Sequence, residues 1–403
     1  MKVPLPPLLT ISEKTAPPVE LKGLPLLRLG FRPFYLGAAL LACLIVPLWV
    51  AVFLGLFELP LSGSPMLWHA HEMLFGFVAG VIAGFLLTAV KAWTGLPTLR
   101  GGWLGALVLV WLSARISALL GPYQLHVVLD MLWLPAVAIV LLRVLILAGN
   151  RRNIPLISLL LGMALVNLMF HLSMLGVVEL PALAFLHAQL ALVLMVVCVM
   201  AGRVVPMFTQ NVTPGLKIHL SRRFELSVLS TTAATLTLWV VSAPAWLMLP
   251  FCMITAALHA MRLRQWQPQV TLARPILWIL HASYAWLPVG FALLGLSQLG
   301  WVPSSLAVHA MGVGVAGGFI IGMITRTARG HTGRLLQVSR AEVLAYALVM
   351  TATMVRVVIP ALQPAWTVVA IEASAGLWSL AFAIYLWMYT PWLMQTRVDG
   401  KDG

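Results

Sequence analysis

The sequence predicts an all-α membrane protein, a polytopic bundle of twelve transmembrane helices. Hydrophobic residues make up 61% of the 403 residues, charged residues make up 9%, and the mean hydropathy is +0.99, which is far too apolar for a soluble domain. A helix must run about 20 residues to cross the hydrocarbon of a bilayer. On that criterion we expect spans at residues 34–57, 69–90, 103–121, 126–147, 155–176, 180–201, 225–243, 245–263, 275–297, 304–325, 341–360 and 365–390.

The placement of Lys and Arg predicts the orientation of these spans. Basic residues occupy only alternate connections, as at Lys91 and Arg100 and at Arg151 and Arg152, whereas the connections between them, such as 298–303, carry none. The positive-inside rule then places both termini in the cytoplasm, because an even number of spans returns the chain to its starting side. The net charge of +14 is therefore a topology signal and indicates no nucleic-acid partner.

The chain ends and the cysteines carry no cofactor signal. Residues 1–24 are rich in proline and lack the apolar core of a signal peptide, so we expect a disordered cytoplasmic arm there and a cytoplasmic tail at residues 392–403. The cysteines lack CxxC or CxxCH spacing, which argues against a zinc ribbon and covalent c-type haem. We expect small buried apolar residues at Cys43, Cys198 and Cys252.

One predicted helix occurs twice in the chain. His71 is followed by glycines at the same spacings as His309, at a constant offset of 238 residues (309 minus 71). The glycines are explained first by close helix packing in lipid; they are Gly76, Gly80 and Gly84 in one copy and Gly314, Gly318 and Gly322 in the other. We infer three tandem four-helix units of one orientation, at residues 25–147, 148–263 and 264–391.

The histidines gather toward the two faces of the predicted bundle. Neutral imidazole is the commonest protein ligand of haem and copper, so a layer of histidines favours a metal or haem site. His71 and His309 hold equivalent repeat positions in the outer layer. That layer contains His69, His71, His126, His171, His187 and His309, and the inner one contains His219, His259, His281 and His331.

Two arginines, Arg115 and Arg356, lie inside predicted spans near the outer face. An arginine at membrane depth is costly unless paired, which makes each a candidate for a functional site. One interpretation is internal salt bridges, Arg115 with Asp130 or Glu72 and Arg356 with Glu372. The other is that both arginines bind the propionates of a haem, because the planar guanidinium binds carboxylates bidentately.

Several long motifs resemble those of the NnrS family. They are LRLGFRPF at 27–34, WHAHEMLFG at 68–76, AGRVVPMFT at 201–209, RPILWILH with YAWLP at 274–288, and GHTGR at 330–334. The resemblance runs from residue 25 to about 390, with one departure at Lys91-Ala92, where the family pattern has Pro-Asn. It implies a haem- and copper-containing protein of the bacterial inner membrane, linked to denitrification and to resistance to nitric oxide.

The resemblance and the outer histidines together predict a non-covalent, b-type haem. His71 and His309 are the first choices as iron ligands, and His187 holds the corresponding place in the middle unit. Because His69 lies roughly 200° around the helix from His71, it is left for a second metal. With His171 it is a candidate copper ligand, aided by His126 and by the thioether of Met66 or Met73.

A second haem or metal site is predicted near the inner face. Its candidate ligands are His281, His259 and His331, and the alternative is that these side chains make inner-face hydrogen bonds. Two haem layers would permit electron transfer across the membrane from an electron donor.

Three classes of function fit these observations. The first is a redox haem protein that binds or processes nitric oxide, with an open iron position in an apolar pocket. The second is a sensor that binds nitric oxide without turnover through the same ligands. The third is a twelve-helix transporter, although proton-coupled transport usually needs carboxylates deep in the membrane, and the acids here lie near helix ends.

Overall fold

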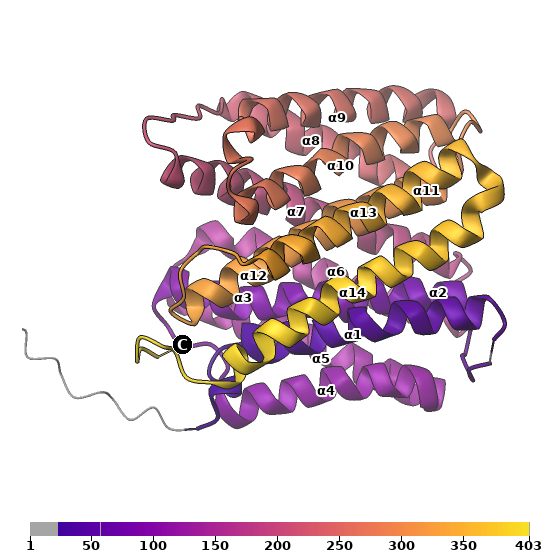
Figure 1. Ribbon diagram of the computed structural model, residues 1–403. Helices are drawn as coiled ribbons and strands as arrows, with labels where there is room; N and C mark the ends of the chain where they lie inside the picture. The colour runs from indigo at the N-terminus through magenta and orange to yellow at the C-terminus, as the bar shows by residue number, and fades with distance from the viewer. Residues whose placement is uncertain (1–22, 57, 403) are drawn as a thin grey trace, which may run out of the picture.

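The computed structural model describes residues 23–56 and 58–402, and this part of the chain is helical, without strands, as predicted (Figure 1). The predicted arm at 1–24 lies outside the described residues, except for Gly23 and Leu24. The helices are α1 (Phe31–Phe53), α2 (Pro65–His71), α3 (Ala79–Thr94), α4 (Gly101–Leu120), α5 (Tyr123–Leu147), α6 (Ile154–Met174), α7 (Ala182–Val212), α8 (Arg222–Val240), α9 (Ala245–Gln265), α10 (Pro275–Ser297), α11 (Ser304–His309), α12 (Gly318–His331), α13 (Arg340–Leu362) and α14 (Thr367–Met394).

Eleven helical segments in the described residues are long and apolar enough to cross a membrane. In this count α2 and α3 form one continuous segment, Pro65–Thr94, and α11 and α12 form another, Ser304–His331. The prediction of twelve spans is therefore confirmed for eleven. The remaining helix, α8, lies beside α7 and α9 but is rich in Ser and Thr.

The hydroxyls of α8 reduce the cost of placing that helix among apolar neighbours. Thr231, Thr232, Thr235 and Thr237 each donate a hydrogen bond to a carbonyl four residues earlier in the helix. Because their donors are satisfied internally, these side chains need no water. A helix that is polar by composition can thus pack against apolar helices, as α8 does against α7 and α9.

The last helix returns to the first. α14 packs against both α13 and α1, and Arg32 donates hydrogen bonds to the carbonyls of Leu393 (2.8 Å) and Gln395 (2.7 Å). The described chain therefore begins and ends at the same end of the bundle (Figure 1). We call it the basic end, because Lys91, Arg100 and the other basic connections lie there, and we call the other the opposite end.

The C-terminal residues fold back onto the basic end. Asp402 forms ion pairs with Arg100 (3.2 Å) and Lys91 (3.3 Å). Partial burial raises the pKa of the Asp402 carboxyl, but Lys91 and Arg100 lower it by more, so the pKa lies below its ordinary value. The tail is thus held by charge at neutral pH.

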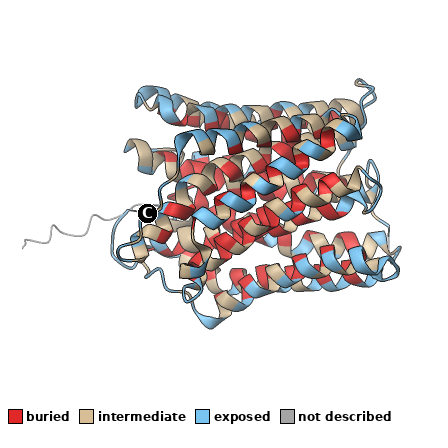
Figure 2. Ribbon diagram, turned by 90° about the horizontal axis from the view of Figure 1, so that it is seen from above, coloured by how far each residue is buried: buried red, intermediate tan, exposed pale blue. Residues whose placement is uncertain are grey.

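The two repeat copies form the centre of the bundle. In Pro65–Thr94, 78% of the most apolar stretch is buried, and in Ser304–His331 the share is 72%, whereas no other span exceeds 61%. Buried residues accordingly concentrate on the inner helices, and exposed residues lie on the outer faces (Figure 2). The three-unit organisation remains a prediction, but its two most similar copies are both mostly buried in the core.

Both central helices contain a π-helix at the same repeat position. These wider turns, Glu72–Val78 and Ala310–Gly317, begin directly after His71 and His309. Such segments carry i to i+5 hydrogen bonds, are rare, and occur frequently at functional sites. The shared position shows that the 238-residue repeat extends to an irregular backbone feature.

Glycines in the second π-helix admit neighbouring helices at close range. A Cβ on Gly314 would lie 2.5 Å from Cγ of Trp286 and 2.8 Å from Cγ2 of Thr353, whereas a Cβ on Gly312 would meet nothing within 4 Å. Gly314→Ala should therefore lower the free energy of unfolding by about 1–3 kcal/mol through overpacking. Gly312→Ala should leave it unchanged or raise it by up to about 1 kcal/mol. Thermal unfolding in detergent measures both, and equal effects would contradict this account.

Candidate metal centre

Three histidines and one aspartate converge near the opposite end of the bundle. His71 ends α2, His126 and Asp130 lie one turn apart on α5, and His171 lies near the end of α6. All four side chains are buried, and one ligand atom from each lies within 4.8 Å of the others. Imidazole nitrogen and carboxylate oxygen are ligands of first-row transition metals, so the cluster is suited to one metal ion. We call it the buried cluster.

Asp130 connects the members of the buried cluster. Its Oδ2 lies 3.3 Å from Nε2 of His71 and 3.2 Å from Nε2 of His171, and it accepts a hydrogen bond of 2.7 Å from the Asn167 amide. Its Oδ1 accepts from the Trp133 indole at 3.2 Å. These contacts orient the carboxylate toward the histidines.

Further contacts orient the imidazole rings. Nδ1 of His126 donates to the carbonyl of Ala114 at 3.0 Å, which leaves Nε2 with its lone pair toward the cluster. Nδ1 of His171 is hydrogen bonded to the hydroxyl of Tyr123 at 2.8 Å. Metal-binding histidines usually have such a partner on the nitrogen that does not bind the metal.

The charge balance of the buried cluster favours a cation. Arg115 forms ion pairs with Glu72 (2.7 Å) and with Asp130, and all three side chains are buried. Two carboxylates against one guanidinium leave one net negative charge when the histidines are neutral. Among the described residues, Oε2 of Glu72 finds no hydrogen-bond partner. Because an uncompensated buried charge is costly, a bound cation would stabilise this arrangement.

A small cavity lies against the buried cluster. Its volume is about 40 Å³, and His71, His126 and Tyr123 line it together with mostly apolar residues such as Phe170 and Met174. A water molecule needs roughly 10–15 Å³ of such space. The cavity therefore admits a diatomic molecule beside two candidate ligands, but no large substrate.

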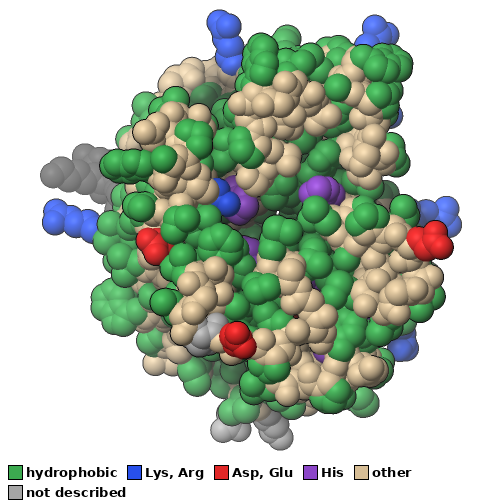
Figure 3. All heavy atoms as spheres, turned by 90° about the vertical axis from the view of Figure 1, so that its right-hand side faces the viewer, with side chains coloured by type: hydrophobic (Ala, Val, Ile, Leu, Met, Phe, Trp, Pro, Cys, Tyr) green, Lys and Arg blue, Asp and Glu red, His purple; other side chains and the backbone are tan. Residues whose placement is uncertain are grey.

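A second group of candidate residues lies at the same end: His69 in the last turn of α2, His309 at the end of α11 and Arg356 near the end of α13. His69 stacks on Trp49, with ring centroids 4.3 Å apart, and no described residue forms a hydrogen bond with its Nδ1. Nδ1 of His309 donates to the carbonyl of Ser305 at 2.7 Å, which leaves Nε2 available. Figure 3 shows histidine side chains around a hollow at this end, one of them beside a basic side chain. We call these three residues the outer group.

The two arginines predicted to be functional differ in their pairing. Arg115 makes the salt bridges with Asp130 and Glu72 that were one predicted alternative. Arg356 is not joined to Glu372 or to any other acid by an ion pair within the described residues, although only 9% of it is exposed. Arg356 is therefore the one of the two with a guanidinium available for a ligand.

The first-choice iron ligands, His71 and His309, belong to different groups. His71 contacts the rings of His126 and His171 at centroid distances of 5.5 and 5.3 Å, whereas His309 lies with His69 and Arg356. His69 and His71 lie on the same short helix, but the contacts of His71 are with the buried cluster and those of His69 are with Trp49.

The remaining predicted histidines make other contacts. His187 stacks on Trp239 at 4.5 Å. Both ring nitrogens of His259 are hydrogen bonded, to Thr232 and to Tyr284, whereas His281 bonds Thr209 through Nε2 and has no partner at Nδ1. His331 lies against Phe31, with ring centroids 5.5 Å apart. None of these contacts links His259, His281 and His331 to one another, and a haem held by them remains a prediction.

Sequence reasoning missed Asn167 and Tyr123 and treated Asp130 only as a salt-bridge partner. A signal for them was present, because His126 with Asp130 and Asn167 with His171 are each four residues apart and so share a helix face. Two polar faces on consecutive helices indicate a shared buried site.

The fold and the buried cluster define a class of protein: a helical membrane protein with side chains suited to binding a metal ion near one end of its spans. The family described as NnrS protein matches residues 25–397, nearly the whole chain, and the chain belongs to the NnrS family. No curated protein gives a significant match.

Proposed function

We propose that this protein is a metalloprotein of the bacterial inner membrane that binds or processes nitric oxide, and so protects against nitrosative stress and supports denitrification. The observation that carries the proposal is the buried cluster, which offers three imidazoles and a carboxylate to one ion. Family membership and the cavity of about 40 Å³ beside the cluster favour a small gas as the ligand. The basic end faces the cytoplasm in this proposal, following the positive-inside rule.

Copper is the ion that we propose for the buried cluster. Imidazole suits copper, iron, nickel and zinc, and copper binds most tightly along the first-row series. Redox chemistry of nitric oxide also needs a metal that changes its oxidation state, which zinc does not. Two predicted copper ligands, His126 and His171, are in the cluster, and His71 with Asp130 would replace His69 and the methionines.

The surrounding residues have separate roles in this proposal. Arg115 balances part of the charge of Asp130 and Glu72, which lowers the cost of burying these two side chains. Tyr123 is half-buried and bonded to His171, which places a hydroxyl between the cluster and the surface where it could pass a proton inward. The buried position excludes bulk water from the reacting ligand.

The buried cluster does not fit a haem. The porphyrin nitrogens occupy the plane around the iron, so protein ligands bind only from its two faces. Four ligand atoms within 4.8 Å of one another leave no room for that plane. We therefore propose His71 as a copper ligand, and not as the partner of His309.

The outer group fits a non-covalent haem better. His69 and His309 each have a ring nitrogen without a protein partner, and Arg356 has a guanidinium free of ion pairs within the described residues. We propose that His69 and His309 hold the iron and that Arg356 binds a propionate. When bound, haem would supply a redox-active iron, with an electron donor as a partner.

Metal analysis of the purified protein tests the copper proposal. His126→Ala should lower copper content by about tenfold or more, because a ligand with a fixed orientation is removed. His259→Ala is the matched control, since that ring is also buried but bonds Thr232 and Tyr284. Wild-type protein that contains no copper when copper is supplied would refute the proposal. Consumption of nitric oxide with an electron donor separates turnover from binding alone.

A further inference from the structure

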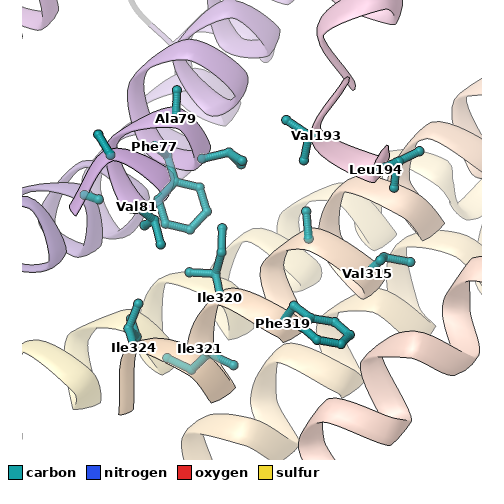
Figure 4. Packing of buried hydrophobic residues seen from close by; sticks show 14 of the residues in the cluster. Phe77, Ala79, Val81, Val193, Leu194, Val315, Phe319, Ile320, Ile321 and Ile324 are labelled. Atoms are coloured by element: carbon teal, nitrogen blue, oxygen red, sulfur yellow. The ribbon is translucent and has the colours of Figure 1, made fainter. Parts of the chain in front are cut away.

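A second cavity system lies between the two repeat copies, and none of its lining residues belongs to the buried cluster or to the outer group. A wide chamber of about 510 Å³ at the basic end and a narrower apolar shaft of about 90 Å³ share three lining residues, Phe85, Val204 and Met323. Most of the wall comes from α3, α12 and α7, and the two π-helices, α1 and α6 contribute a few further residues. Figure 4 shows Val81, Ile320 and Val193 from α3, α12 and α7 around the space between them.

The lining follows the internal repeat. Residues of α3 and the preceding π-helix match residues of α12 and its π-helix at the offset of 238, so both copies contribute equivalent positions to the wall. The matched pairs are Val78 with Ala316, Val81 with Phe319, Ile82 with Ile320, Phe85 with Met323, Thr88 with Arg326 and Ala89 with Thr327. The two copies therefore contribute equivalent faces to the cavity wall.

A face of α7 closes the cavity along one side. Its lining residues recur every three or four positions, which is one face of a helix: Val193, Val196, Val197, Met200, Val204 and Phe208. Along α7 the lining of the shaft runs from Val193 to Val204, about 16 Å at 1.5 Å per residue. That length is about half of the roughly 30 Å hydrocarbon core, or one leaflet.

The two copies differ in charge at the chamber, which forms the mouth of the cavity at the basic end. Thr88 in one copy corresponds to Arg326 in the other, and the chamber is also lined by His331 and Arg397. Arg326 lies over the Phe208 ring at 3.7 Å and has no ion pair within the described part of the chain, whereas Arg397 pairs with Asp399. The mouth is thus positive, and the shaft above it is apolar.

We propose that this cavity binds an anionic phospholipid, with its phosphate at Arg326 and one acyl chain in the shaft. Charge complementarity identifies the headgroup, because a guanidinium binds phosphate through paired hydrogen bonds. Basic pockets between helices on the cytoplasmic side are known sites for anionic headgroups. The length and the apolar lining of the shaft match an acyl chain. The site shares no residue with the buried cluster or the outer group.

Native mass spectrometry of the intact protein from nanodiscs tests this site, using an equal mixture of phosphatidylglycerol and phosphatidylcholine. Wild-type protein should retain phosphatidylglycerol. Arg326→Gln should reduce retention about tenfold, as expected for loss of one charge-assisted contact. Ile320→Phe, which narrows the shaft, should also reduce it. Arg264→Gln changes an exposed arginine at the same end and should have no effect.

The variants separate a lipid site from other sources of the same signal. If Arg326→Gln lowers retention but Ile320→Phe does not, in protein that remains monodisperse, only a surface phosphate contact exists and the proposal fails. Equal retention of both lipids by wild-type protein would also refute it. A haem Soret band that disappears in His331→Ala would show that the chamber holds haem instead.

Discussion

Asp130→Ala is expected to empty the buried cluster of metal and to lower the free energy of unfolding by about 3–5 kcal/mol. The carboxylate is a candidate ligand and also the ion-pair partner of the buried Arg115. Its loss removes the acceptor of Asn167 and Trp133 as well. Copper content and chemical unfolding, measured on the same purified sample, report the two effects separately.

Glu342→Ala is the matched control for this prediction. Glu342 is also buried and accepts hydrogen bonds of 2.7 and 2.6 Å from Arg329, but it lies at the basic end on α13. This variant should be destabilised by a similar amount and should keep its copper. Full copper content in Asp130→Ala would show that the aspartate is no ligand, and copper loss in both variants would show that the metal follows stability alone.

His309→Ala is expected to abolish the haem Soret band while leaving the copper content unchanged. The reason is that His309 supplies one of the two ring nitrogens proposed for the iron and makes no contact with the buried cluster. His126→Ala should show the converse pattern, with copper lost and the Soret band kept. Optical spectra and metal analysis of both variants, expressed with ample haem, give this double comparison.

His187→Ala is the control for removing a histidine at this end of the bundle, and it should change neither the Soret band nor the copper content. Its ring is half-buried and stacks on Trp239 without taking part in either group. If His71→Ala and His309→Ala each abolished the Soret band and left the copper content unchanged, the iron ligands would be His71 and His309, as the sequence predicted. A colourless wild-type protein would remove haem from the proposal and leave the copper centre to stand alone.

The fold class followed from composition because eleven apolar helices of sufficient length can be counted without tertiary knowledge. The ion pair of Arg115 with Glu72 and Asp130 was also predictable, since few acids exist at that depth. Which helices lie next to one another was not predictable from the sequence. His171 reaches the cluster because α6 packs against α5, across the boundary predicted between two repeat units, and no sequence spacing specifies that contact.

The π-helices explain another limit of sequence reasoning. A regular α-helix turns about 100° per residue, so neighbouring side chains point apart. His71 and Glu72 are nevertheless both buried at the start of the wider turn and hydrogen bonded to each other at 3.2 Å. The glycine spacing is shared by the two helices, but that spacing alone does not distinguish a π-helix from close helix packing.

The contact between α1 and α14 has a consequence for biogenesis. A membrane protein is synthesised from its N-terminus, and segments made early can pack only with partners that already exist. Here the first helix must wait for the final one, since α14 packs against α1, and Leu393 of α14 and the following Gln395 supply carbonyls to Arg32. A ribosome that stops before α14 would therefore leave the N-terminal helix with a lipid-facing seam, a state that quality-control proteases can recognise.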